Sequence, residues 1–282
     1  MTLREELSFF LTNRVPRRWF TLLMGRLSPL EVPFVTSVAI GLWKLFSDLD
    51  LSEARKSRFT SLQDCFIREL KPGARPIAQD PATLVSPCDG IVGACGTIDR
   101  GTVLQAKGFP YTVIELLADA ALAQVYEGGQ YVTLRITPTM YHRFHAPQDL
   151  EVQHVTYVSG DTWNVYPIAL RRVPRLFCRN ERAILRCRLS SSGTPIALVP
   201  VAAILVASIR LHCADVLLHL KYPGPNEIPC TARYEKGQEM GWFQHGSTII
   251  ALVPKGVALS EGVCEGKRIR MGEPLFCEAT SK

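Results

Sequence analysis

The chain has 282 residues, of which 47% are apolar and 21% charged, so it can bury the core of one large domain or two small ones. Its net charge of +6 is mildly basic, whereas a dedicated nucleic-acid-binding protein is expected to have a strongly basic, clustered surface. A mildly basic chain suits an anionic lipid surface or an acidic small substrate. The 9 cysteines are odd in number and include no C-x-x-C pair, which argues against a full set of disulfides and against a zinc site. We therefore expect reduced thiols in a protein that faces the cytosol.

The first 50 residues are predicted to form an amphipathic helical segment. Basic side chains are interleaved there with Trp19, Phe20, Phe34, Trp43 and Phe46. This mixture is typical of helices that lie in a lipid interface, and it also fits a helical layer packed on a core. No secretory signal is recognised at the N-terminus, and the longest uncharged stretches, 32–43 and 193–209, are shorter than a bilayer span.

Residues 51–282 are predicted to form a β-rich body. One or two helices are expected over 51–70, with Ser52 and Ser61 as caps, and one clear helix over 112–125. Strand patterns are more numerous, and we expect them over 83–98 on both sides of a turn and in four further segments: 130–137, 151–158, 183–190 and 247–254. Because the strands are not regularly interleaved with helices, the predicted fold class is α+β with a β-rich core.

A Gly-Ser-Thr step opens the last of these strands. Gly246 and Ser247 can be an ordinary turn, since glycine and serine are common there. Alternatively, Ser247 is a nucleophile, which requires a base elsewhere in the chain. His142 and His145 lie in a short loop at a strand exit, "TPTMYHRFHAP", and Asp89 lies in a tight turn where its carboxylate could orient an imidazole. Local pattern alone leaves these assignments open.

Five segments together resemble one family, the pyruvoyl-dependent phosphatidylserine decarboxylases of bacteria. The segments are "PCDG" with Asp89, "LQAKG" (104–108), "YHRFHAP" (141–147), "LFCRNER" (176–182) and "KGQEMGWFQHGST" (236–248). They occur in the order and spacing of the family, and the similarity extends from about residue 66 to the C-terminus.

The resemblance implies that the chain cuts itself between Gly246 and Ser247 into a large chain, 1–246, and a small chain, 247–282. It implies that His145, oriented by Asp89, takes the proton of Ser247, whose Oγ attacks the preceding carbonyl, and that Ser247 becomes an N-terminal pyruvoyl group. That group would serve as the covalent cofactor and electron sink, with no metal and no external cofactor.

For the substrate, the resemblance implies phosphatidylserine, contacted by Tyr141 and Asn164, with His142 returning a proton to Cα. The product would be phosphatidylethanolamine. The enzyme would be a homodimer held peripherally at the cytoplasmic face of the cell membrane, with residues 1–50 on an anionic lipid surface and no nucleic-acid partner.

The sequence departs from the family pattern at two places. His245 stands where bacterial members usually have leucine, which bears on the rate of self-cleavage, and Asn164 and Tyr166 alter a segment near the substrate. Lys107 and Glu239 lie within matched motifs, where we expect ion pairing or backbone hydrogen bonding. Three alternatives stay open: an uncleaved serine hydrolase using Ser247, His145 and Asp89, a non-catalytic membrane scaffold, and a pyruvoyl decarboxylase of a soluble amino acid.

Overall fold

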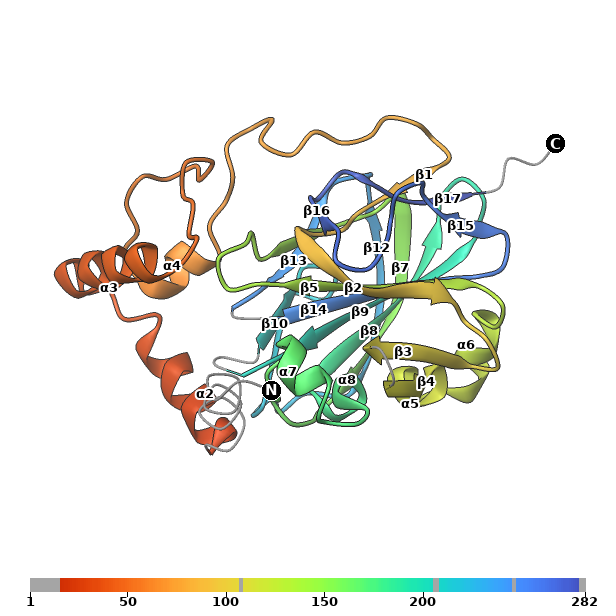
Figure 1. The fold of residues 1–282 in the computed structure, drawn as a ribbon, viewed down its shortest axis with the longest axis horizontal. Coiled ribbons are helices and arrows are strands. Elements are labelled where there is room, and N and C mark those ends of the chain that lie inside the picture. The colour runs from red at the N-terminus through yellow and green to blue at the C-terminus, as the bar shows by residue number, and fades with distance from the viewer. Residues whose placement is uncertain (1–15, 107–108, 205–207, 245–246, 279–282) are drawn as a thin grey trace.

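The computed structural model describes residues 16–106, 109–204, 208–244 and 247–278. Strands dominate, which confirms the predicted β-rich α+β class (Figure 1). The largest sheet is antiparallel, with the strand order β12 (Glu227–Tyr234), β7 (Leu150–Val158), β8 (Arg182–Leu189), β9 (Pro195–Ala202), β14 (Ser247–Val253), β5 (Gln130–Ile136), β2 (Gly90–Thr97) and β16 (Arg268–Ile269).

Three smaller sheets complete the β structure of the described ranges. They are β11 (Val216–His219), β10 (Ser208–Leu211), β13 (Glu239–Phe243) and β6 (Arg143–His145); β1 (Thr83–Val85), β17 (Pro274–Glu278) and β15 (Val257–Leu259); and the pair β3 (Thr102–Ala106) and β4 (Phe109–Thr112). The strand, turn and strand predicted over 83–98 are confirmed, but β1 and β2 belong to different sheets.

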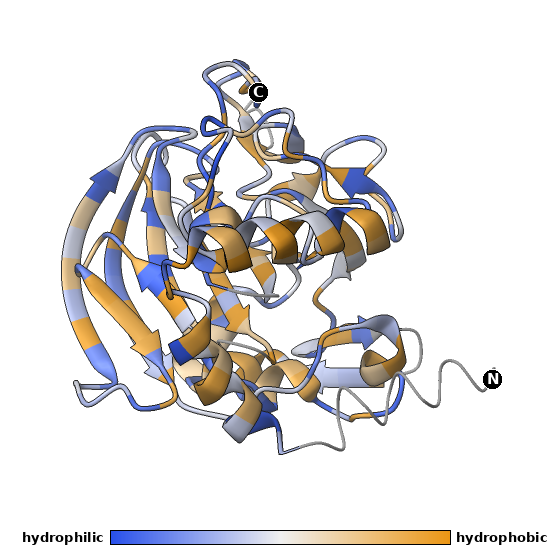
Figure 2. Cartoon of the chain, turned by 90° about the vertical axis from the view of Figure 1, so that its left-hand side faces the viewer, coloured by the Kyte–Doolittle hydropathy of each residue, from blue (hydrophilic) through white to orange (hydrophobic). Residues whose placement is uncertain are grey.

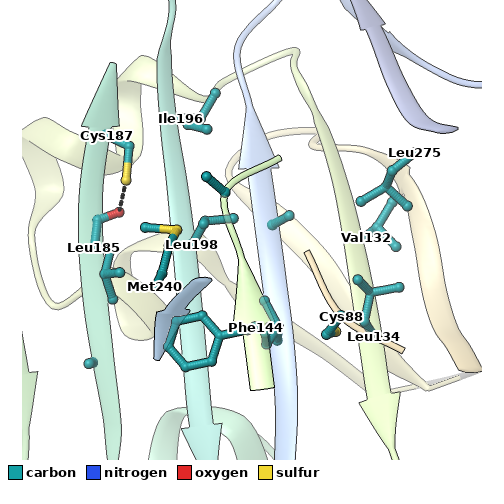
Figure 3. Packing of buried hydrophobic residues seen from close by; sticks show 14 of the residues in the cluster. Cys88, Val132, Leu134, Phe144, Leu185, Cys187, Ile196, Leu198, Met240 and Leu275 are labelled. Atoms are coloured by element: carbon teal, nitrogen blue, oxygen red, sulfur yellow. Dashed lines mark hydrogen bonds between the residues drawn. The ribbon is translucent and has the colours of Figure 1, made fainter. Parts of the chain in front are cut away.

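One face of the large sheet packs against the four-stranded sheet, and we call it the inner face. On β14, the side chains of Ile249, Ala251 and Val253 belong to the buried cluster of this face. Figure 3 shows Phe144 of β6 and Met240 of β13 over the strands of the large sheet. Because side chains alternate along a strand, Ser247 also lies on the inner face, and Thr248 lies on the opposite face.

The opposite face is covered by β3, β4 and four short helices, α5 (Val113–Leu117), α6 (Ala120–Val125), α7 (Pro167–Leu170) and α8 (Leu176–Arg179). The single helix predicted over 112–125 is wrong. Ala118 adopts a left-handed conformation and ends α5, and the side chain of Asp119 caps α6 by accepting a hydrogen bond from the Leu122 amide at 2.9 Å. Two caps within two residues therefore divide the apolar pattern into two helices.

From residue 16 onward, the N-terminal part has the helices α2 (Arg17–Leu27), α3 (Pro33–Phe46) and α4 (Leu62–Phe66), which lie together at one side of the sheets (Figure 1). Ser61 caps α4 as predicted, since its Oγ accepts from the Asp64 amide at 3.0 Å. No helix begins at Ser52, where the chain forms turns. None of the 9 cysteines, all of which lie within the described ranges, is joined in a disulfide.

Helices α2 and α3 bury polar side chains and expose apolar ones, which is the reverse of the pattern in a helix packed on a core. Their buried side chains are Thr21 and Thr36, whereas Trp19, Phe34 and Phe46 are each at least 80% exposed. Figure 2 shows the apolar band along these helices. None of the described helices has the length and apolar character needed to cross a membrane.

Candidate active site

Ser247 is the first residue of β14, in the middle of the large sheet. It is opposite Ile136 of β5 and Ala202 of β9 and is fully buried. Its Oγ has no hydrogen-bond partner among the described residues. A buried hydroxyl without a partner costs free energy, so such a group calls for a functional explanation. Gly246 and His245, on the N-terminal side of Ser247, lie outside the described residues.

His145 lies on β6 and is buried, with both ring nitrogens in hydrogen bonds. Its Nδ1 is 2.9 Å from the carbonyl oxygen of Gly237, and its Nε2 is 2.9 Å from the hydroxyl of Tyr141. A carbonyl only accepts, so Nδ1 carries the hydrogen and Tyr141 donates to Nε2. Burial is the largest effect on the ring and lowers the pKa of His145 below its usual value. The imidazole is therefore held neutral, with Nε2 as its basic nitrogen.

Asp89 has a different partner from the one that its predicted role suggests. Its two carboxylate oxygens accept from Nε and Nη2 of Arg75 at 2.8 and 2.6 Å, and Oδ1 also accepts from the Met271 amide at 2.9 Å. Among the described residues, no hydrogen bond joins Asp89 to His145, and none joins His145 to Ser247. The Asp89 charge acts on His145 through space and favours its protonated form.

Arg75 is the residue that sequence reasoning missed, because the segment 71–77 reads only as a loop. Its guanidinium contacts Glu53 at 2.8 Å as well as Asp89, and its side chain is 7% exposed. Arg75, Asp89 and Tyr141 line one polar cavity of about 220 Å³. Gly237 was likewise missed as a partner of His145; its φ of +80° is one that glycine adopts readily.

His142 is fully buried at the start of β6. Its Nδ1 lies 2.8 Å from the carbonyl oxygen of Met140, and its ring packs on Phe66 with 3.9 Å between ring centroids. Its own carbonyl accepts from the Phe243 amide at 2.9 Å, which ties it to the strand that leads toward Ser247. Because Nδ1 donates to a carbonyl, Nε2 is the ring nitrogen able to exchange a proton.

Asn164 lies in a loop that is anchored to the strand beside Ser247. Its Oδ1 accepts from the Tyr166 amide at 2.9 Å, so this side chain shapes its own loop. Asn180 fixes the loop to the sheet, because its Nδ2 donates to the carbonyls of Trp163 at 2.8 Å and Ala202 at 2.9 Å. Ala202 is the residue opposite Ser247. The fold thus brings the 159–166 segment near the start of β14.

Comparison with known proteins identifies the family. The family model for phosphatidylserine decarboxylase matches residues 62–277. The chain belongs to the phosphatidylserine decarboxylase family. Similar proteins include the phosphatidylserine decarboxylase proenzymes of Brevibacillus brevis, 36% identical over 94% of this chain and 95% of that protein, and of Photobacterium profundum, 38% identical over 92% of each.

The prediction of a phosphatidylserine decarboxylase from five motifs is therefore confirmed, and the word proenzyme in the names of these relatives agrees with a chain that is processed. Within the matched motifs, Glu239 has the ion-pairing role expected of it. Its carboxylate accepts from Arg143 and from His212 Nε2 at 2.9 Å, and it is the residue opposite His145. Lys107 lies outside the described residues, so its expected role stays a prediction.

Proposed function

We propose that this chain cleaves itself between Gly246 and Ser247 and then decarboxylates phosphatidylserine to phosphatidylethanolamine with the pyruvoyl group formed from Ser247. The observation that carries the proposal is the buried Oγ of Ser247, without a described partner at the start of the central strand. An ordinary turn serine would be exposed or bonded to nearby backbone. The burial of Ser247 and its unbonded Oγ therefore fit a serine that reacts and is converted to a pyruvoyl group better than a serine that stabilises a turn.

Self-cleavage needs a base that removes the Ser247 hydroxyl proton. The neutral ring of His145 suits this role, because burial keeps its Nε2 unprotonated near neutral pH. Tyr141 occupies Nε2 in the described geometry, so its hydroxyl has to move or pass the proton on. The carbonyl of Gly237 fixes the tautomer of His145, which is the task expected of Asp89. Asp89 then acts through its negative charge and its hold on Arg75.

The pyruvoyl group supplies an electron-accepting carbonyl for the carbanion that remains when CO₂ leaves the substrate. His142 would return the proton to the substrate Cα from Nε2, since Nδ1 is engaged with Met140. Tyr141, which lines the polar cavity beside Asp89, and Asn164 are the candidates for holding the serine headgroup.

Residues 1–50 would hold the enzyme on an anionic membrane at its cytoplasmic face, where the substrate resides. Apolar side chains on α2 and α3 point to solvent, and threonines take the inward positions. Such a surface is stable in water only if something apolar covers it. We expect a homodimer as the working form and no nucleic-acid partner.

The mass of the purified protein tests the function. The proposal expects two chains, 1–246 and 247–282, with a small chain whose N-terminus is blocked and gains hydrogen on treatment with borohydride. A small chain that begins with free serine would contradict pyruvoyl formation. One full-length chain that reacts with a fluorophosphonate would instead indicate the serine hydrolase, and a full-length chain that reacts with nothing would indicate the scaffold.

A further inference from the structure

A buried carboxyl group lies two strands from Ser247 on the same face of the large sheet. Glu181 is 1% exposed, and its carbonyl oxygen accepts from the Ala202 amide at 2.8 Å. Ala202 is in turn opposite Ser247, so Glu181, the residue before β8, forms one row with Ala202 of β9 and Ser247 of β14. Figure 1 shows these three strands side by side. With neighbouring strands about 4.8 Å apart, the backbones of Ser247 and Glu181 are separated by roughly 10 Å.

The side chain of Glu181 lies on the inner face, as that of Ser247 does. Ala183 and Leu185 of the adjoining strand belong to the inner-face cluster, and alternation places Glu181 with them. Its hydrogen bond to the hydroxyl of Tyr157, another member of that cluster, agrees with this placement. Only the methyl group of Ala202 stands between Ser247 and Glu181 in the row.

Hydrogen counting in this cluster points to a carboxyl that can hold a proton. The hydroxyl of Tyr157 contacts Oε1 of Glu181 and also the carbonyl oxygen of His219 at 3.0 Å. Tyrosine has a single hydroxyl hydrogen, which Tyr157 donates to Oε1 when Glu181 is ionised. When Glu181 is protonated it can itself donate to Tyr157, and the tyrosine hydrogen is then free to go to the carbonyl of His219. Oε2 then remains an acceptor, and no described residue is bonded to it.

The charged groups near Glu181 come from three elements. Burial is the largest effect and raises the pKa of Glu181 to about 7, while the hydrogen bond from Tyr157 and the charge of Arg18 on α2 favour the ionised form. Arg17 is paired with Asp161 at 2.7 Å, and the backbone carbonyl of Asp161 accepts from the Glu181 amide at 2.9 Å. The side chain of His219 accepts from the Lys221 amide. His219 therefore takes part in the cluster through its backbone carbonyl, which accepts from Tyr157. Both protonation states of Glu181 are thus accessible near neutral pH.

From this geometry we infer that Glu181 binds the amino group of the substrate and takes its proton, so that the nitrogen can attack the carbonyl made from Ser247. The inference rests on the proposed function. In this step the N–H bond of the substrate ammonium group breaks, its electron pair stays on nitrogen, and an O–H bond forms on Oε2 of ionised Glu181. The products are a neutral amine and a neutral carboxyl group. Tyr157 is a positioning residue that holds the carboxyl in place.

The test compares two amines that capture the carbonyl of the self-cleaved enzyme. Phosphatidylethanolamine in detergent micelles is protonated at neutral pH and carries no carboxylate to lose, whereas the nitrogen of phenylhydrazine is already unprotonated. Capture is followed as the mass gain of the small chain, after cyanoborohydride reduction for the lipid. Glu181→Gln is expected to slow capture of phosphatidylethanolamine at pH 7 by tenfold or more and to leave capture of phenylhydrazine unchanged.

The inference would be overturned if Glu181→Gln captured both amines at the wild-type rate, or if it captured both more slowly than wild type. If wild-type protein is uncleaved and captures neither amine, the proposed function itself has failed, which is a separate result.

A second measurement does not depend on cleavage. In the Ser247→Ala precursor, infrared spectroscopy should show a protonated carboxyl band that titrates near pH 7 and is absent after Glu181→Gln. A precursor without this band at pH 5.5 would contradict the inference, because Glu181 would then be ionised throughout.

Discussion

His145 donates its Nδ1 hydrogen to the carbonyl oxygen of Gly237, at 2.9 Å, and this bond decides which ring nitrogen can act as a base. A carbonyl oxygen can only accept a hydrogen bond, so the ring nitrogen that faces it must carry the hydrogen. The backbone therefore fixes the neutral tautomer in which Nε2 is the basic nitrogen. The orientation of the predicted base therefore depends on a turn that no side-chain motif reveals.

The pH dependence of self-cleavage follows from this environment. Burial lowers the pKa of His145, so the neutral ring persists to lower pH than in an exposed histidine. We expect the cleavage rate to rise from acid pH with a midpoint below pH 6.5, the usual histidine pKa. Gel analysis of freshly synthesised precursor at a series of pH values measures this. A midpoint above 6.5 would contradict the role given to His145, as would normal cleavage of His145→Ala.

The two adjacent hydroxyls at the start of β14 provide a matched pair. Ser247 and Thr248 are both fully buried, and both hydroxyls lack a described partner, but they lie on opposite faces of the sheet. Ser247→Ala should abolish cleavage, because the attacking oxygen is lost. Thr248→Val should still be cleaved, since it removes a hydroxyl of equal burial on the wrong face. Intact mass distinguishes the two, and cleavage of Ser247→Ala would refute the assignment.

Breaking the buried pair of Asp89 and Arg75 should destabilise the fold. Their side chains are 9% and 7% exposed, so Asp89→Asn leaves a buried guanidinium with less compensation. We expect a loss of about 3 kcal/mol in the free energy of unfolding, measured by urea denaturation in the Ser247→Ala background. Arg55→Gln is the control, because its pair with Glu69 is exposed and should contribute less than about 1 kcal/mol. Equal effects of the two variants would argue against a supporting role for Arg75.

Membrane association should depend on the exposed aromatic residues of α3. Phe34 and Phe46 are 80% and 82% exposed, and burying each in lipid would contribute on the order of 2 kcal/mol. Replacing both with glutamine should weaken binding to anionic vesicles by tenfold or more in a sedimentation assay, with self-cleavage intact. Ile114→Gln on α5, 51% exposed and distant from α3 in Figure 1, should bind as wild type does. Unchanged binding of the double variant would exclude α3 as the anchor.

Glu181 should make stability decrease as the pH rises. Burial raises its pKa from 4.5 to about 7, so the folded state binds this proton more tightly than the unfolded state. The resulting stability is fully present below pH 4.5 and is lost as the pH rises through 7, by up to about 3 kcal/mol. In the Ser247→Ala background, Glu181→Gln should remove most of this dependence between pH 5 and pH 8. An unchanged slope would show that Glu181 is not the titrating group.

Local pattern was sufficient for much of the fold, because alternation and caps are short-range effects. The strands β5, β7, β8 and β14 appear where the apolar pattern indicates them, and Ser61 caps α4 as its position predicts. The break at Ala118 and Asp119 was missed, because both flanking segments have the same helical periodicity. The burial of Thr21 and Thr36 in place of the apolar side chains could not be predicted from composition. The mixture of aromatic and basic residues over 1–50 fits a core-packed helix and an interfacial helix equally well.

The sequence by itself determined the family and the serine at which the chain is predicted to break, since those depend on residue types at fixed spacing. Only the tertiary structure decided which groups surround that serine. Gly237 reaches His145, Arg75 holds Asp89, and Glu181 shares a face with Ser247 through hydrogen bonds and strand register between segments distant in the chain. Such contacts depend on how strands are ordered and paired, and the residues involved carry no local mark of their partners.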